Sequence, residues 1–189
     1  FAQLTIRVVY CVLGDSDRQA LRQYRENNTR RIMDERQLDA LLLMSLDNVR
    51  YATDFYRPFY SLEGYAEHFG ALVPKEGNLV FFAIPPDPYF RKVNPWIVDV
   101  RYLQSYLSSC DYASWAGEIK KSIEDLNLSK KKIGIDYMSF HALNYLKEEL
   151  PSASFEAVYD DLLRVRTIKH PLELRLIKEA VKIADLAIK

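Results

Sequence analysis

The feature that most constrains the fold is a series of short apolar runs separated by polar or helical sequence. The run LDALLLMS at 38–45 is almost continuously apolar, which is typical of a strand buried on both faces of a sheet. Five further runs have the length and composition of strands: FGALVP at 69–74, NLVFFAI at 78–84, WIVDV at 96–100, KIGID at 132–136 and SFEAV at 154–158.

Helical patterns occupy most of the intervals between these runs. The predicted helices cover residues 15–36, 47–55, 113–126, 139–150 and the stretch from 171 onward. Residues 75–77 form a tight turn between two strands, and 85–95 holds four of the eight prolines, so it is predicted to be a loop. This order predicts an α/β fold, with a mixed sheet of about five to six strands covered by helices.

Charge and cysteine content exclude several classes of protein. The 26 basic and 26 acidic side chains balance, so no net field attracts nucleic acid or an anionic membrane. The arginines of the first helix are interrupted by acidic residues, and we expect them to face solvent. Cys11 and Cys110 are far apart and indicate neither a disulfide scaffold nor a structural zinc site. We expect a cytoplasmic protein with no membrane segment.

Catalytic motifs are missing from the sequence. The three histidines, His68, His141 and His170, form no ligand pair at helical spacing. HExxH, CxxC, a glycine-rich phosphate loop and GxSxG are all absent. The residues alone therefore indicate an α/β domain without a self-contained active site.

Two segments resemble a known family, the creatinase/prolidase amino-terminal domain. LDALLLMSLDNVRYATDF at 38–55 is similar to its first strand and helix. LLRVRTIKHPLELRLIKEAVKIAD at 162–185 is similar to the junction where that domain passes into the catalytic domain. The junction pattern is carried by Arg166, Ile168, Lys169, Pro171, Glu173, Ile177, Lys178, Ala180 and Asp185.

The resemblance implies a ribonuclease H-like fold and a larger parent enzyme. Residues 1–14 are then an extension of unknown role, 15–165 the amino-terminal domain, and 166–189 a linker and the first helix of a pita-bread catalytic domain. The apolar stripe of that helix still runs at Lys189, so we expect the catalytic domain to be cut off here. Two divalent ions (Mn, Co or Zn) are expected in that missing domain, and none in this chain.

Implied roles for this chain are dimerisation and contact with substrate. In the family, a loop of the amino-terminal domain leans over the partner subunit's pocket, and the matching segment here is 54–69. Its candidate substrate-contacting residues are Asp54, Arg57, Tyr60, Tyr65 and His68. The guanidinium fork of Arg57 fits a substrate carboxylate. The alternative is that this loop only packs the dimer.

Three hypotheses for the parent protein remain open. The first is a prolidase-like Xaa-Pro dipeptidase that acts on small peptides. The second is a creatinase-like hydrolase that is not a peptidase, and the third is a peptide-binding module without catalysis. In each case the expected partners are a second copy of the chain and its own carboxy-terminal domain.

Overall fold

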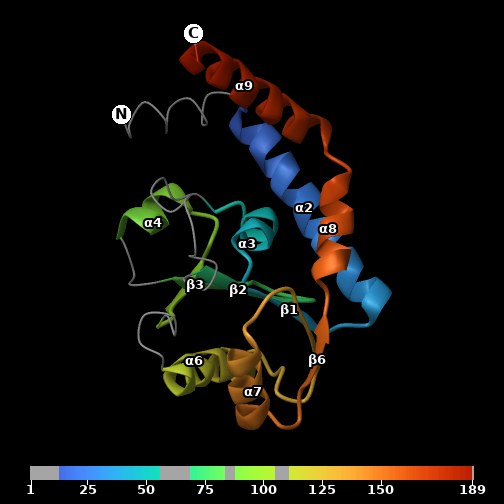
Figure 1. The fold of residues 1–189 in the computed structure, drawn as a ribbon, viewed down its shortest axis with the longest axis vertical. Helices are drawn as coiled ribbons and strands as arrows, with labels where there is room; N and C mark the ends of the chain where they lie inside the picture. The colour runs from blue at the N-terminus through green and yellow to red at the C-terminus, as the bar shows by residue number, and fades with distance from the viewer. Residues whose placement is uncertain (1–12, 56–68, 84–87, 105–110, 189) are drawn as a thin grey trace.

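A six-stranded mixed sheet forms the centre of the fold (Figure 1). The computed structural model describes residues 13–55, 69–83, 88–104 and 111–188. The strands are β1 (Ala40–Leu43), β2 (Phe69–Pro74), β3 (Val80–Ala83), β4 (Asp99–Tyr102), β5 (Lys132–Ile135) and β6 (Ser154–Ala157). Their spatial order is β4-β3-β2-β1-β5-β6. β2 pairs antiparallel with both β1 and β3, and the other neighbours are parallel. The predicted α/β class and mixed sheet are confirmed.

Strand β1 lies inside the sheet because its side chains are apolar on both faces. All four of its residues are buried. Leu41 and Leu43 pack into one hydrophobic cluster, whereas Ala40 and Leu42 pack into a second cluster. Successive side chains of a strand point to opposite faces, so the continuous apolar run serves two cores at once.

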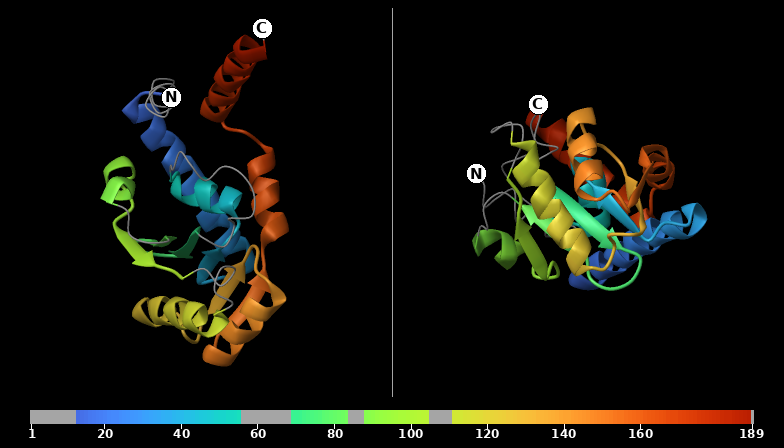
Figure 2. Two further views of the ribbon diagram at one scale, coloured as in Figure 1. Left: turned by 60° about the vertical axis from the view of Figure 1, so that its left-hand side comes forward. Right: turned by 90° about the horizontal axis from the view of Figure 1, so that it is seen from below.

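Seven helices are described, and they cover the two faces of the sheet. They are α2 (Asp15–Arg36), α3 (Leu46–Thr53), α4 (Pro88–Val93), α6 (Tyr112–Asp125), α7 (Phe140–Glu149), α8 (Tyr159–Thr167) and α9 (Pro171–Ile188). Residues of α2, α3, α4 and α8 belong to one cluster, and residues of α6 and α7 belong to the other. Figures 1 and 2 show α6 and α7 together on one side of the sheet, opposite α2, α3 and α8.

The prediction of a loop over 85–95 is wrong for residues 88–93. Residues 88–93 form helix α4, which begins at Pro88. Proline is tolerated in the first turn of a helix, where its missing N–H is not needed. The helix is held by Phe90, which is buried and stacks on Phe81 with a centroid distance of 4.8 Å. Proline content alone therefore does not exclude a helix here.

The strand predicted at 96–100 begins later than expected. β4 starts at Asp99, and Trp96 and Ile97 lie in the preceding turn. Ile97 is buried in the core, and the Trp96 indole N–H donates to the Thr53 carbonyl at 2.8 Å. These apolar residues anchor a turn rather than extend a strand. Helix α8 was not predicted at all; it buries only Leu162 and Val165.

Helix α9 stands apart from both cores. None of its eighteen residues is buried, and it extends beyond the body of the domain at the top of Figure 1. Its exposed large apolar residues are Leu174, Ile177, Val181, Ile183, Leu186 and Ile188. Among the described helices, none is long and apolar enough to cross a membrane.

Candidate functional site

Of the five predicted substrate-contacting residues, the structure describes Asp54. Arg57, Tyr60, Tyr65 and His68 lie outside the described residues. Asp54 is the C-cap of α3 and has a left-handed backbone, with φ 52° and ψ 26°. Its N–H donates to the Arg50 carbonyl at 2.8 Å, which closes the last turn of the helix.

Two arginines of α2 contact the Asp54 carboxylate. Arg25 Nη1 donates to Oδ1 at 2.9 Å, and Arg22 Nη1 lies 3.5 Å from Oδ2. Burial raises the pKa of the Asp54 carboxyl, and the charges of Arg25 and Arg22 oppose that rise. Arg22 also lies over the Trp96 ring, with Cζ 4.5 Å from its centroid. Asp54 is therefore a paired carboxylate and not a free general base.

Arg25 also contacts the start of α9. Its Nε donates to Glu173 Oε1 at 3.0 Å, and its Nη2 lies 2.9 Å from the same oxygen. The two side chains are only 15% and 13% exposed. The guanidinium Cζ also lies 5.5 Å from the centroid of the Tyr51 ring. One side chain thus joins α2, the end of α3 and α9.

The entrance of α9 is capped by its own side chains. Glu173 Oε2 accepts the His170 N–H at 3.0 Å, and His170 Nδ1 accepts the Leu172 N–H at 3.2 Å. Glutamate three residues after the cap, with Pro171 between them, is the arrangement of a capping box. The His170 ring packs on Tyr24 with a centroid distance of 4.6 Å. His170 therefore has a capping role, and Glu173 serves both the cap and the ion pair.

Asp54 and Tyr51 lie between two cavities. One has a volume of about 530 Å³ and is bounded by the ends of α3, α8 and α9, with Arg50, Arg166 and Lys169 in its wall. The other has a volume of about 250 Å³ and lies between α2, α3 and the β2–β3 turn. Two of the acidic side chains in these walls, Asp54 and Glu173, are bound to arginine.

Asp136 is a second buried carboxylate, at the end of β5. It accepts N–H groups from Met44 at 2.7 Å, Ser45 at 3.1 Å, Asn48 at 3.0 Å and Tyr137 at 2.6 Å. Burial raises the pKa of this carboxyl, and the hydrogen bonds oppose the rise. A buried acid at the carboxyl ends of parallel strands is a usual catalytic candidate. Here its oxygens instead hold the β1–α3 connection.

The Asp136 contacts continue to the junction segment. Asn48 donates to Asp136, and its Oδ1 accepts from Arg166 Nη1 at 2.7 Å. Arg166 Nη2 also lies 3.6 Å from the exposed Asp47. The amide of Asn48 therefore links the end of β5 to α8. Asn48 and Arg166 come from the two separate sequence segments that carry the family resemblance.

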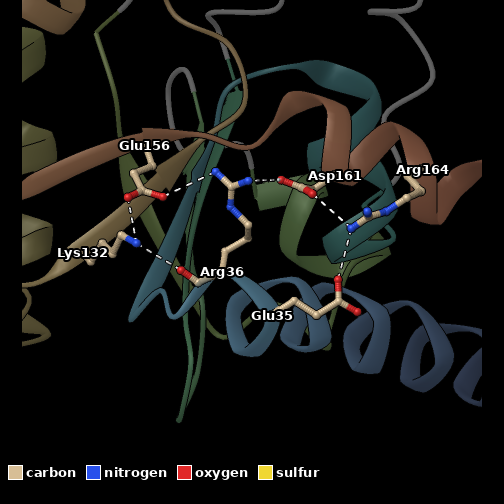
Figure 3. Close-up of polar contacts among 6 residues, drawn as sticks. All are labelled: Glu35, Arg36, Lys132, Glu156, Asp161 and Arg164. Carbon is tan, nitrogen blue, oxygen red and sulfur yellow. Dashed lines mark hydrogen bonds and ion pairs between the residues drawn. The ribbon is translucent and has the colours of Figure 1, made fainter.

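A surface charge network fixes the other end of α2 (Figure 3). Arg36 Nη2 lies 3.5 Å from Glu156 on β6, and its Nη1 lies 3.7 Å from Asp161 on α8. Lys132 Nζ contacts Glu156 at 2.7 Å, and this hydrogen bond lowers the pKa of the Glu156 carboxyl. Arg164 joins Asp161 to Glu35, each at 3.1 Å. The network joins the end of α2 to β5, β6 and α8.

A metal centre does not fit the described residues. Within the described ranges, no group of three or more His, Cys, Asp or Glu side chains is placed to hold a metal ion.

Sequence reasoning missed the two side chains that organise this region. Arg25 belongs to a helix whose arginines were expected to face solvent, and its partner Glu173 lies 148 positions away. Asp136 carried no motif. The only signal was the junction pattern, which includes both Glu173 and Arg166.

Comparison with known families and structures covers most of the chain. The profile of the Creatinase/Prolidase N-terminal domain matches residues 25–168. Among curated proteins no relative matches the sequence.

Several solved structures are similar. Xaa-Pro dipeptidase from Bacillus anthracis matches with a TM-score of 0.62 and 20% identity over 88% of this chain and 41% of that chain. The prolidase from Pyrococcus horikoshii OT3 matches with a TM-score of 0.58 and 19% identity, over 87% and 41%. The N-terminal domain of the cytoplasmic peptidase PepQ from Mycobacterium tuberculosis H37Rv matches with a TM-score of 0.56 and 16% identity, over 75% and 98%. Identities this low indicate a shared fold, and the chain spans less than half the length of the first two proteins.

Proposed function

The chain belongs to the creatinase/prolidase N-terminal domain family, and from this premise we propose that it is the non-catalytic amino-terminal domain of a Xaa-Pro dipeptidase. The observation that carries the proposal is the family match over residues 25–168 in a chain that spans 41% of a similar Xaa-Pro dipeptidase. The part of such a protein that this chain does not match is long enough for a separate catalytic domain.

The domain boundary that we propose falls near residue 165. Residues 15–165 form the α/β domain, and 166–189 are a linker and the first helix of a catalytic domain. The exposure of α9 supports this division, because none of its residues is buried and six of its large apolar side chains are exposed. A helix with an exposed apolar face gains stability by packing on another surface.

The parent enzyme in this proposal is a homodimer in which each subunit reaches the other's active site. Segment 54–69 carries the contacting residues, and Asp54 holds its first position against α2 through Arg25 and Arg22. Small Xaa-Pro peptides are the substrates, and two divalent metal ions (Mn, Co or Zn) are held by the catalytic domain. The similarity to a cytoplasmic peptidase supports a cytoplasmic location.

A complementation experiment tests the contribution of the loop in trans. One variant of the two-domain protein carries Arg57→Ala in the loop, and the other lacks a metal ligand in its catalytic domain. Each variant alone is expected to be inactive toward a Xaa-Pro dipeptide. In a mixed dimer, one catalytic site receives an intact loop from its partner. Equal mixing should therefore restore about one quarter of the wild-type activity, as random pairing of a two-fold dimer requires.

The mixture also distinguishes the alternatives. If the loop served its own subunit, refolding the two variants together would restore no activity. If the loop only packs the dimer, Arg57→Ala alone would keep its activity per dimer but would weaken the dimer in sedimentation. Full activity of monomeric protein would contradict both the proposed homodimer and the proposed contribution of the loop to the partner's active site.

A further inference from the structure

Among the described residues, helix α9 makes few contacts that could fix its direction. Burial contributes little, because no residue of α9 is buried. One of its ion pairs joins Arg175 to Asp17 at 3.3 Å, but those side chains are 57% and 41% exposed. Exposed pairs of this kind contribute little to stability. The ion pair between Arg25 and Glu173 is better shielded, because these side chains are only 15% and 13% exposed.

The guanidinium of Arg25 is suited to hold two acids in fixed directions. It is planar, permanently charged and carries donors along two edges. Nε and Nη2 meet one oxygen of Glu173, while Nη1 meets Asp54. Asp54 is itself fixed, because its backbone closes helix α3. Asp54 therefore fixes the position of Arg25 relative to the end of α3, and Arg25 in turn fixes Glu173.

We propose that Arg25 is a positioning residue that sets the direction in which α9 leaves the α/β domain, and that Asp54 acts on α9 through Arg25. Within the described part of the chain, Asp54 makes no hydrogen bond or ion pair with α9 itself. The guanidinium of Arg25 contacts both carboxylates and so connects Asp54 to Glu173 on α9. One consequence rests on the proposed function: if a catalytic domain continues from α9, Arg25 also determines where that domain lies relative to the α/β domain.

Hydrogen exchange measured by mass spectrometry on the 189-residue chain tests the bridge directly. A detached helix of this length is marginal in water, so its amides exchange faster when it loses its support. The informative variants are Arg25→Gln, Arg25→Lys and Asp54→Asn. Glu173→Gln removes the charge but keeps an acceptor for the cap, because glutamine also serves in a capping box. Arg175→Gln is the matched control, an α9 ion pair that is exposed.

The expected result is a selective release of α9. Exchange over residues 171–188 should rise about tenfold in Arg25→Gln and Glu173→Gln, and several-fold in Asp54→Asn. Lysine at 25 keeps the charge but cannot bond both acids with the same geometry, so it should not restore protection. The control should change exchange by less than about twofold. Peptides from β1 and β2 should exchange as in the wild type.

Three outcomes would overturn the proposal. Unchanged exchange of α9 in Arg25→Gln would show that other contacts set its direction. Faster exchange of α9 in Arg25→Gln but not in Asp54→Asn would show that Asp54 does not act on α9 through Arg25. Equal acceleration in β1, β2 and α9 would mean a general loss of stability. None of these measurements involves peptidase activity, so the bridge and the proposed function can fail separately.

Discussion

Removal of the Asp136 carboxylate should be among the most damaging single changes in this domain. In Asp136→Ala the N–H groups of Met44 and Asn48 lose their acceptor while buried. A buried donor left without a partner costs about 1–3 kcal/mol, so the two together predict a loss of about 2–6 kcal/mol. The partly buried donors Ser45 and Tyr137 can turn to water and add less. Such a loss is a large part of the free energy of unfolding of an ordinary domain.

Urea denaturation followed by circular dichroism measures this loss from the shift in midpoint at constant slope. Asp99→Asn is the control, because Asp99 pairs with Arg101 at the surface and should change stability by less than about 1 kcal/mol. A loss below about 1 kcal/mol for Asp136→Ala would refute the reasoning, since it would mean that these N–H groups find other partners at low cost.

Three further predictions concern packing, pH and backbone strain. Gly134→Ala should cost about 1–3 kcal/mol in urea denaturation, because its Cβ would lie 2.6 Å from a neighbouring leucine methyl; an unchanged midpoint would mean that the neighbouring side chains move aside at no cost. The hydrogen bond from Lys132 lowers the pKa of Glu156 below its usual 4.5, so this pairing stabilises the protein above that pH and is lost as pH falls through the lowered pKa. In thermal denaturation, the Tm of the wild type should exceed that of Glu156→Gln near neutral pH, and the difference in Tm should disappear in acid. A difference in Tm that does not change with pH would contradict this reasoning. Gln37 has φ 54° at the end of α2, so Gln37→Gly should raise the unfolding free energy by about 0.5 kcal/mol, whereas Asn127→Gly, at φ 57°, should gain less because asparagine tolerates this region.

The strands could be predicted from the sequence because their apolar character is local. The run at 38–45 contains β1, and the runs at 69–74 and 132–136 contain β2 and β5, within a residue or two of their observed bounds. Burial on both faces of a sheet leaves a continuous apolar run, and that signal needs no knowledge of the partner strands.

The two missed helices lack such a signal. Helix α8 has nine residues and only Leu162 and Val165 buried, which is too short a stripe to show helical periodicity. Helix α4 begins at Pro88 within a proline-rich block, and it is stabilised by a buried Phe90 rather than by local propensity. Tertiary packing decides the structure of both segments.

The candidate site could be predicted only in part, because its interactions are long-range. The resemblance identified Asp54, but nothing local marks Arg25 among the arginines of a charged helix. Its role depends on Asp54, 29 positions away, and on Glu173, 148 positions away. Charge pairing across such separations becomes visible only once the chain is folded.

We propose that this α/β domain is the non-catalytic part of a two-domain Xaa-Pro peptidase. The most direct test compares the 189-residue chain with the same protein extended through its natural carboxy terminus. Both are incubated with Xaa-Pro dipeptides in the presence of Mn²⁺, Co²⁺ or Zn²⁺, and release of proline is measured. The account predicts metal-dependent cleavage by the extended protein and none by the shorter chain. Cleavage by the 189-residue chain alone, or none by the extended protein with any of the three metals, would contradict it.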